Sequence, residues 1–462
     1  MNANAMPFRD WYALSSNPLV PLSIGGHRVT QDGVDAAHML SRQTWKGNED
    51  FRRTINRDEF HKMSFVAIAE TLSNAPTHLP PGDPVDGKTI TVDTNFFSVL
   101  AKEYIDQLNN LANRRRSDLY WHVPCHLFDR DQKVAAFSVG SVEFSPRTDW
   151  IRRFVTDEGE RSYIDQVEAG TLEMDEVRRL ALAPSHRRGQ LDAWHVLRFL
   201  QGFSWVSTVE IRGHELARSH DKASVLVGLA IDAIGSRFHI DDARRFAKAG
   251  REHPFAEVRL ATDTGGAVVT TSSVQIPGLR GGPRSLAAKM TAERPFLNAA
   301  GLLLDVYKEG RQTGRAPRLI ERWANALYWF GEARREPSDF MAVVKYGCAA
   351  DTLSGAGGNS KEMIEFAEAA LNPKGNPTNS SSISDAITRL YSQGRNKIAH
   401  GEEPGLLEDL TETRAIGDAL LSGLFDSVTP ALAEIQASKP NILTLKEGQA
   451  IRAFKERLEQ RS

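Results

Sequence analysis

Three polar side chains near the C-terminal end of a helical stretch, Arg395, Asn396 and His400, could together act on a phosphate group. The planar guanidinium of arginine binds two phosphate oxygens at once and is charged at any physiological pH. An imidazole can accept or donate a proton near neutral pH. An amide such as that of Asn396 can orient a phosphate or the hydroxyl that attacks it. These residue types at this spacing predict proton transfer at a phosphodiester.

The helix that must position them is predicted over residues 383–400. Asn396 and His400 are four residues apart and lie together on one side of this helix, with Arg395 on its flank. Gly401 predicts a left-handed cap, which places His400 in the last turn, where the helix dipole favours the protonated imidazole. A polar trio that faces away from its own core is exposed to solvent or presented to another chain. The apolar stripe on the opposite side consists of Ile383, Ile387, Leu390, Tyr391 and Ile398.

The segment RNKIAHG resembles the Arg-Asn-x-x-x-His motif of HEPN-domain proteins, and the run of predicted helices across 318–440 resembles their helical bundle. Most members are metal-independent endoribonucleases whose two motifs meet across a homodimer. The resemblance therefore implies that Arg395, Asn396 and His400 are catalytic, without a cofactor, on single-stranded RNA. It also implies an acid in the predicted helix that contains VVKYGCAADTLSG, for which Asp351 is the candidate, and a role as a toxin or antiphage effector. A member that only binds RNA is the alternative.

Acidic residues at the ends of predicted strands form a second constellation. Asp93 follows the strand TITV, Asp129 or Asp131 follows LYWHVPCHLF, Asp192 opens a helix, and Glu210 closes the strand WVST. In a parallel sheet the carboxyl ends of the strands meet at one crevice. Carboxylates gathered there can all ionise only beside a cation, so the pattern predicts bound Mg²⁺ or Mn²⁺ and metal-assisted attack of water on a phosphodiester.

The segments VDTN and LDAWHVLRFLQGFSWVSTVE resemble two motifs of PIN-domain nucleases, and VPCHLFD stands where that family has its second acid. The resemblance covers residues 88–215 and implies a parallel, helix-covered sheet with these acids as metal ligands. The sequence departs from the family pattern in having Asp129 where Glu is usual and Glu210 where Asp is usual. The alternative is that Asp93 and Asp192 are helix caps or turn residues and that Glu210 is a surface residue.

Two segments rich in Pro and Gly, THLPPGDPVDGK at 77–88 and KEGRQTGRAPR at 308–318, are predicted linkers. Periodicity is helical before the first linker, at 34–45 and 59–73, and throughout the region after the second. The fold class expected is multidomain, α/β plus all-α. The expected parts are a helical N-terminal region (1–80), a PIN-like α/β domain with a parallel sheet (88–220), a mixed α/β extension (221–310) and a HEPN-like helical bundle (318–440).

Charge, composition and missing motifs exclude several classes of function for this 462-residue chain. The 57 Lys and Arg nearly balance 59 Asp and Glu, so the net charge of −2 does not attract polyanions and an RNA site must be a local patch. Two cysteines are too few for a disulfide framework or a four-cysteine zinc site. On a strand, His122 and His126 are too far apart to share one ion. No GxSxG, HExxH or Walker motif is present, which argues against a serine hydrolase, a zinc protease or a P-loop NTPase.

The first residues lack a basic region followed by an apolar stretch, and the longest apolar run, around 225–230, is too short for a membrane span. A cytoplasmic protein without a membrane partner is therefore expected. The main hypothesis is a metal-independent endoribonuclease that acts as a homodimer. The alternatives are a metal-dependent PIN-type nuclease whose helical domain forms the dimer, and an RNA-binding sensor without catalysis.

Overall fold

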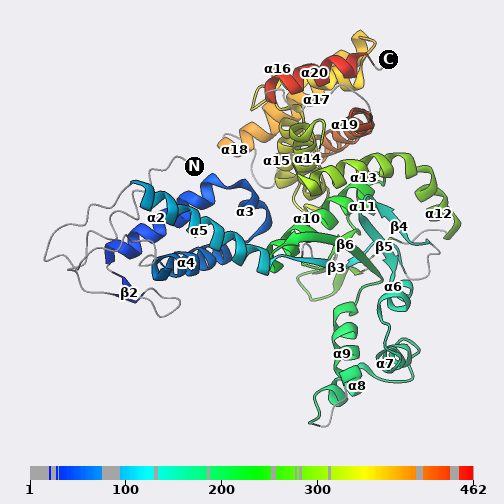
Figure 1. The fold of residues 1–462 in the computed structure, drawn as a ribbon. Coiled ribbons are helices and arrows are strands. Elements are labelled where there is room, and N and C mark those ends of the chain that lie inside the picture. The colour runs from blue at the N-terminus through cyan, green and yellow to red at the C-terminus, as the bar shows by residue number, and fades with distance from the viewer. Residues whose placement is uncertain are drawn as a thin grey trace, which may run out of the picture. The chain divides into compact units, whose positions relative to one another are not determined.

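In the computed structural model the chain forms two compact units (Figure 1). Unit 1 comprises Met1–Trp121 and Glu210–Ala223, and unit 2 comprises His122–Val209 and Ser224–Ser462. Two strands and one helix run from one unit into the other. The residues described are 20–21, 28–29, 31–74, 94–129, 134–184, 188–250, 256–275, 278–279, 283–310, 314–401, 409–437 and 447–460.

Unit 1 is mainly helical, and its apolar residues recur at helical spacing, so that α2, α4 and α5 share one core. The core is centred on Phe51, Phe60, Tyr104 and Leu108, all of which are buried. The helices predicted at 34–45 and 59–73 are confirmed. Helix α5 contributes Leu100, Tyr104, Leu108 and Ala112 to this core. The elements wholly in unit 1 are β1 (Val20–Pro21), β2 (Arg28–Val29), α2 (Gln31–Gly47), α3 (Glu49–Thr54), α4 (Arg57–Asn74) and α5 (Thr94–Arg115).

The central sheet has five strands and is antiparallel, so the expectation of a parallel PIN-like sheet is wrong. Strands β3 and β6 are neighbours that run in opposite directions. Near the start of β3 the side chain of Asp118 accepts the Gly213 N–H at 2.8 Å, and further along β3 the Val123 carbonyl accepts from the Ser207 hydroxyl at 2.9 Å. The strand order is β4 (Phe137–Val139), β5 (Val142–Pro146), β6 (Trp205–His214), β3 (Ser117–His126) and β7 (Ala247–Lys248).

The hairpin β4–β5 sets the relative direction of its two strands. Gly140 between the two strands has a φ of 61°, the left-handed conformation that a two-residue hairpin turn needs. The turn packs so tightly that a Cβ on Gly140 would lie 2.4 Å from the Gly301 carbonyl oxygen of α13 (Arg294–Glu309). Asp305 of the same helix accepts the Ser141 N–H at 2.7 Å. A two-residue turn can join only antiparallel neighbours. Strands β5 and β6 are antiparallel as well, although residues 147–204 separate them in the chain.

Helices and a separate two-stranded sheet make up the rest of unit 2 before the C-terminal bundle. Helices α6 to α9 have a core of their own around Trp150, Ile164 and Leu197. The predicted apolar helix near 223–234 and the strands near 255–262 and 267–276 are present. These elements are α6 (Arg147–Phe154), α7 (Glu158–Glu168), α8 (Met174–Ala181), α9 (Arg188–Leu200), α10 (Leu216–Gly235, which begins in unit 1), α11 (Ile240–Ala243), β8 (Ala256–Thr262), β9 (Val268–Gln275) and α12 (Pro283–Ala292).

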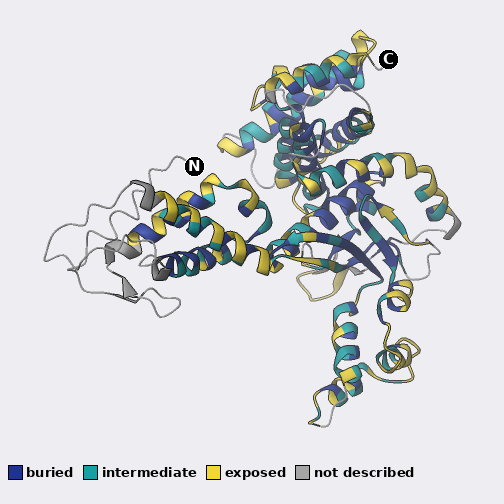
Figure 2. Cartoon of the chain, viewed as in Figure 1, coloured by how far each residue is buried: buried dark blue, intermediate teal, exposed yellow. Residues whose placement is uncertain are grey.

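A bundle of helices completes unit 2, as the periodicity after residue 318 predicts. Large side chains fill its centre, among them Trp323, Phe330 and Tyr346, each fully buried, and Figure 2 shows the buried residues along the inner faces of these helices. None of the described helices is long and apolar enough to cross a membrane. The bundle elements after α13 are α14 (Pro317–Arg335), α15 (Asp339–Ser354), α16 (Ser360–Leu371), α17 (Pro377–Ile387), η2 (Thr388–Asn396), α18 (Lys397–His400), α19 (Thr411–Ala437) and α20 (Glu447–Glu459).

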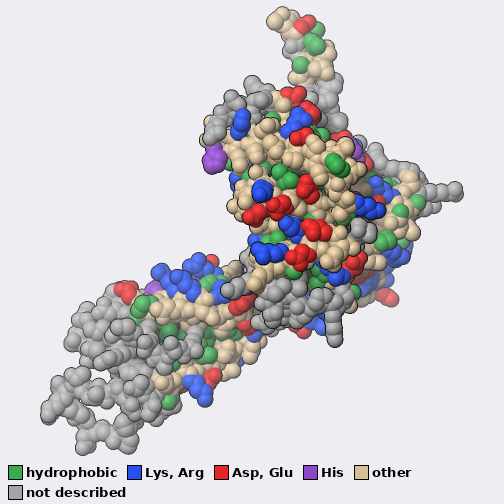
Figure 3. Space-filling view, turned by 90° about the horizontal axis from the view of Figure 1, so that it is seen from above, with side chains coloured by type: hydrophobic (Ala, Val, Ile, Leu, Met, Phe, Trp, Pro, Cys, Tyr) green, Lys and Arg blue, Asp and Glu red, His purple; other side chains and the backbone are tan. Residues whose placement is uncertain are grey.

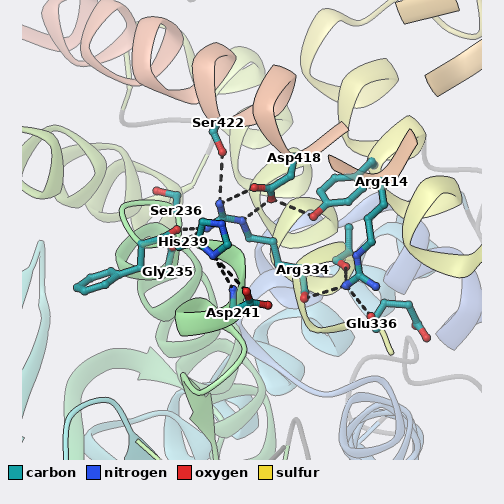
Figure 4. Close-up of polar contacts among 12 residues, drawn as sticks. Gly235, Ser236, His239, Asp241, Arg334, Glu336, Arg414, Asp418 and Ser422 are labelled. Atoms are coloured by element: carbon teal, nitrogen blue, oxygen red, sulfur yellow. Dashed lines mark hydrogen bonds and ion pairs between the residues drawn. The ribbon is translucent and has the colours of Figure 1, made fainter. Parts of the chain in front are cut away.

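A buried arginine joins the bundle to α10 and the turn after it (Figure 4). The guanidinium of Arg334 donates to both carboxylate oxygens of Asp418, at 2.7 and 3.0 Å, and to the carbonyls of Gly235 and Phe238, at 2.5 and 3.1 Å. Tyr346 donates to the same carboxylate at 2.9 Å. Burial and the nearby charge of Asp418 raise the pKa of Tyr346. This junction is the most extensively hydrogen-bonded side-chain site described in the bundle.

Candidate functional site

The segment that carries Arg395 and Asn396 is a π-helix, η2, set between two α-helical segments. The expectation of one continuous α-helix over 383–400 is therefore wrong in its middle. Hydrogen bonds from residue i to i+5 widen the helix, and such segments occur most often at functional sites. The π-helix does not expose the apolar stripe, because all five residues predicted for it are buried.

Two glycines allow η2 to approach α15 closely. A Cβ on Gly347 of α15 would lie 2.6 Å from Cβ of Arg395, and a Cβ on Gly394 would lie 2.7 Å from Cγ1 of Val343. Neither position has room for a larger residue. The backbone at Arg395 is thus fixed by contact between two helices, and its side chain leaves the interface in a defined direction.

Arg395 is half-buried and has polar and aromatic partners but no acidic one among the described residues. Its Nη1 donates to Oδ1 of Asn396 at 2.8 Å, and its guanidinium carbon lies 5.2 Å from the ring centroid of Tyr391. Its buried Nε has no hydrogen-bond partner. The aromatic ring and the amide hold the guanidinium without neutralising it, so most of its donors remain available to an anion.

Asp351 lies beside the same tyrosine, at the C-terminal end of α15. Burial, the charge of Asp351 and a hydrogen bond between the two side chains raise the pKa of Tyr391, while Arg395 acts in the opposite direction. The Gly358 N–H donates to Oδ1 of Asp351 at 2.9 Å from the glycine-rich turn after α15. The structure thus connects Asp351, Tyr391, Arg395 and Asn396 in one row.

His400 is the last residue of α18 and is exposed. Gly401 follows with a φ of 71°, which confirms the predicted left-handed cap. Within the described part of the chain the imidazole makes no hydrogen bond or ion pair, and none connects it to Arg395 or Asn396. The side chain is therefore accessible to a substrate, to solvent or to a second copy of the chain.

Of the four predicted metal ligands, the three that the structure describes, Asp129, Asp192 and Glu210, do not form a site together. Asp93 lies outside the described residues. Asp129 follows β3 beside the start of β6, where the Trp205 indole and the Ser204 hydroxyl both donate to the carbonyl of the preceding residue, Phe128. In an antiparallel sheet the carboxyl ends of neighbouring strands lie at opposite edges, which removes the crevice that the parallel sheet would have provided.

The other two acids are placed differently from the expectation. Asp192 lies in the second turn of α9, not at its start, and pairs with Arg188 one turn away at 3.5 Å. Glu210 lies inside β6, which continues to His214, and pairs with Arg212 at 2.7 Å. In the ranges that the structure describes, no three His, Cys, Asp or Glu side chains are close enough together to hold a metal ion.

The histidines of β3 have protein partners. His122 Nδ1 accepts from the Trp150 indole at 3.1 Å and from the Thr208 hydroxyl at 3.0 Å, and the ring of His126 stacks on Phe203 at 4.5 Å. Burial lowers the pKa of each imidazole to about 4, and the charge of Arg153 adds to this effect at His122. Both rings are neutral members of the sheet core at physiological pH.

Comparison with models of protein families, with curated proteins and with solved structures finds no match to this chain. The contacts of the site therefore carry the functional argument.

The structure also shows two site features that the sequence analysis missed. Tyr391 was assigned only to the apolar stripe, although its spacing of four residues from Arg395 is that of a stacked pair on a helix. Gly347 was not singled out, because a glycine inside a helix gives no sign of which side chain approaches it.

Proposed function

We propose that this protein is an endoribonuclease that cleaves single-stranded RNA by attack of a 2′-hydroxyl on the adjacent phosphate. The observation that carries the proposal is the state of Arg395: a half-buried cation, held by Asn396 and Tyr391, with no acidic partner in the described chain. A fixed guanidinium with free donors binds phosphate oxygens and stabilises the charge that develops at phosphorus.

His400 supplies the proton transfer. As base, the imidazole takes the proton of the 2′-hydroxyl while the 2′-oxygen bonds to phosphorus. As acid, it protonates the 5′-oxygen when the bond from that oxygen to phosphorus breaks. The products are a 2′,3′-cyclic phosphate and a 5′-hydroxyl. Unpaired RNA suits this reaction because its backbone can adopt the in-line geometry, and DNA lacks the hydroxyl.

A second copy of the chain completes the site in this proposal. His400 is exposed and has no bond to Arg395 within its own chain, so two copies could combine their motifs into one centre. In a cell, such cleavage would arrest growth, consistent with a toxin or antiphage effector. A strict monomer at micromolar concentration, measured by light scattering, that still cleaves RNA would contradict the shared site.

The test of the proposed function uses a labelled single-stranded RNA with and without EDTA. We expect wild-type cleavage to survive EDTA and His400→Ala to lose at least about 100-fold in rate. His195→Ala is the matched control, since His195 is also exposed on a helix of unit 2. Activity that EDTA or Asp93→Ala abolishes and that His400→Ala retains would favour the metal-dependent alternative. Binding without cleavage under every condition would favour the sensor.

A further inference from the structure

Two adjoining hollows lie along one face of helix α2 in unit 1. The first has a volume of about 560 Å³ and the second about 230 Å³, and Arg42 and Lys46 line both of them. We call the two together the α2 groove. The remaining lining residues among those described are Asp35, His38, Met39, Gln43, Trp45, Arg57 and His61.

The cations of the groove are not neutralised by ion pairs. No acidic side chain of the described residues lies within ion-pair distance of Arg42, Lys46 or Arg57, all of which are exposed. Arg42 and Lys46 are one helical turn apart, an arrangement in which like charges repel and weaken a helix. A bound polyanion would remove that repulsion. Figure 3 shows Lys and Arg side chains gathered beside a histidine on the described face of this unit.

Hydrogen bonds fix the backbone at one end of the groove and the position of His61. Arg52 donates to the Trp45 carbonyl at 3.0 Å and also to the Lys46 carbonyl, so it fixes the C-terminal turn of α2. Nδ1 of His61 forms a hydrogen bond with the hydroxyl of Ser41 at 2.6 Å. Burial lowers the pKa of His61, and the charges of Arg57, His38 and Arg42 lower it further, while Asp58 acts in the opposite direction.

The groove also contains an aromatic surface. Trp45 is half-buried: its ring packs on Phe60 with centroids 5.0 Å apart and still lines the smaller hollow. His61 lies beside it, with ring centroids 6.5 Å apart. Cations that follow a backbone beside an aromatic ring that can stack a base are the usual combination in proteins that bind single-stranded nucleic acid.

From these contacts we infer that the α2 groove binds single-stranded RNA, with phosphates on Arg42, Lys46 and Arg57 and a base against Trp45. The choice of RNA over another single strand rests on the proposed function, whereas the affinity for a phosphate backbone does not. The groove is thus the local basic patch that a chain of net charge −2 needs in order to bind RNA.

The test measures binding of a fluorescent oligoribonucleotide by anisotropy, in the His400→Ala chain so that the RNA stays intact. We expect Arg42→Glu/Lys46→Glu to weaken binding at least about tenfold and to reduce the salt slope of log K by about 1.4, for two lost phosphate contacts. The matched control is Lys102→Glu/Arg114→Glu, which reverses two exposed charges of the same unit outside the groove. It should change affinity less than twofold.

Equal losses in the two double variants, or no loss in either, would overturn the inference. So would a duplex RNA of equal length that binds as tightly as the single strand, because a base inside a duplex cannot stack on Trp45. The two proposals fail separately. Groove-dependent binding without wild-type cleavage would leave the inference standing and remove the nuclease, whereas cleavage and binding unaffected by the groove variant would do the reverse.

Discussion

Two arginines of the same bundle, Arg334 and Arg395, have opposite surroundings. Arg334 is buried, faces both oxygens of Asp418 and donates to two backbone carbonyls. Arg395 is half-buried and has an amide and an aromatic ring but no acidic partner in the described residues. The first arrangement satisfies the charge inside the protein, and the second leaves it for a ligand. A buried arginine paired with a carboxylate stabilises the fold, whereas one held by an amide and an aromatic ring can still bind an anion.

Removal of the satisfied arginine should have the largest effect on stability. We expect Arg334→Ala to lower the free energy of unfolding by about 3 to 5 kcal/mol, because Asp418 would remain without its cation and two carbonyls without a donor. Urea unfolding followed by tryptophan fluorescence measures the loss. Arg389→Ala is the control, because Arg389 forms an exposed pair with Glu412 in the same bundle, and it should change stability very little. Similar stabilities for the two variants would break the comparison.

Displacement of the unsatisfied arginine should affect activity more than stability. A methyl group at Gly347 would meet Cβ of Arg395 and shift its guanidinium, and a shift near 1 Å can cost about 100-fold in rate. We therefore expect Gly347→Ala to slow RNA cleavage by about 10- to 100-fold, and to destabilise the fold by about 1 to 3 kcal/mol. The measurement is the cleavage rate at a temperature where thermal unfolding shows the variant intact.

Gly448→Ala provides the matched control for this substitution. Gly448 is also inside a helix of the bundle, and no atom lies within 4 Å of the Cβ it would gain. Its activity should equal that of the wild type. A Gly347→Ala protein with full activity would show that the position of Arg395 does not matter for cleavage.

The same contrast extends to histidines, with a smaller effect. His126 is buried with a pKa of about 4, below its ordinary value of 6.5, so the unfolded chain binds the extra proton between these two pH values. The contribution of His126 to the free energy of unfolding is therefore complete above about pH 6.5 and falls as the pH decreases toward 4. Between pH 7 and pH 5 the loss should be about 2 kcal/mol.

The variant His126→Gln should lack this part of the pH dependence, because its side chain does not titrate. Urea unfolding of both proteins at the two pH values gives the difference directly. A wild type that loses no more stability than the variant would contradict the burial argument.

The sequence predicted most helices and the course of the bundle, because apolar residues at helical spacing report burial on a helix. It did not predict the direction of the sheet. The segment FSVGSVEF alternates around Gly140 and forms the β4–β5 hairpin, but the directions of β3 and β6 depend on contacts far apart in the sequence. The acids Asp129, Asp192 and Glu210 are predicted to cluster only if the sheet is parallel.

The candidate site was predictable in part for a related reason. Arg395, Asn396 and His400 are local in the sequence, so their helix and its Gly401 cap could be anticipated. The π-helix and the contact of Gly347 with Arg395 depend on how η2 packs against α15, which no local pattern records. The α2 groove was not anticipated either, since Arg57 joins Arg42 and Lys46 only when α4 folds against α2.

The chemical nature of the RNA ends tests the central claim most directly. Mass spectrometry of the fragments that the wild-type protein releases from a single-stranded RNA identifies both new ends. Attack by the 2′-hydroxyl predicts a 2′,3′-cyclic phosphate on one fragment and a 5′-hydroxyl on the other. A 3′-hydroxyl paired with a 5′-phosphate would show that water, not the 2′-hydroxyl, attacks the phosphate, and would contradict the mechanism proposed for Arg395 and His400.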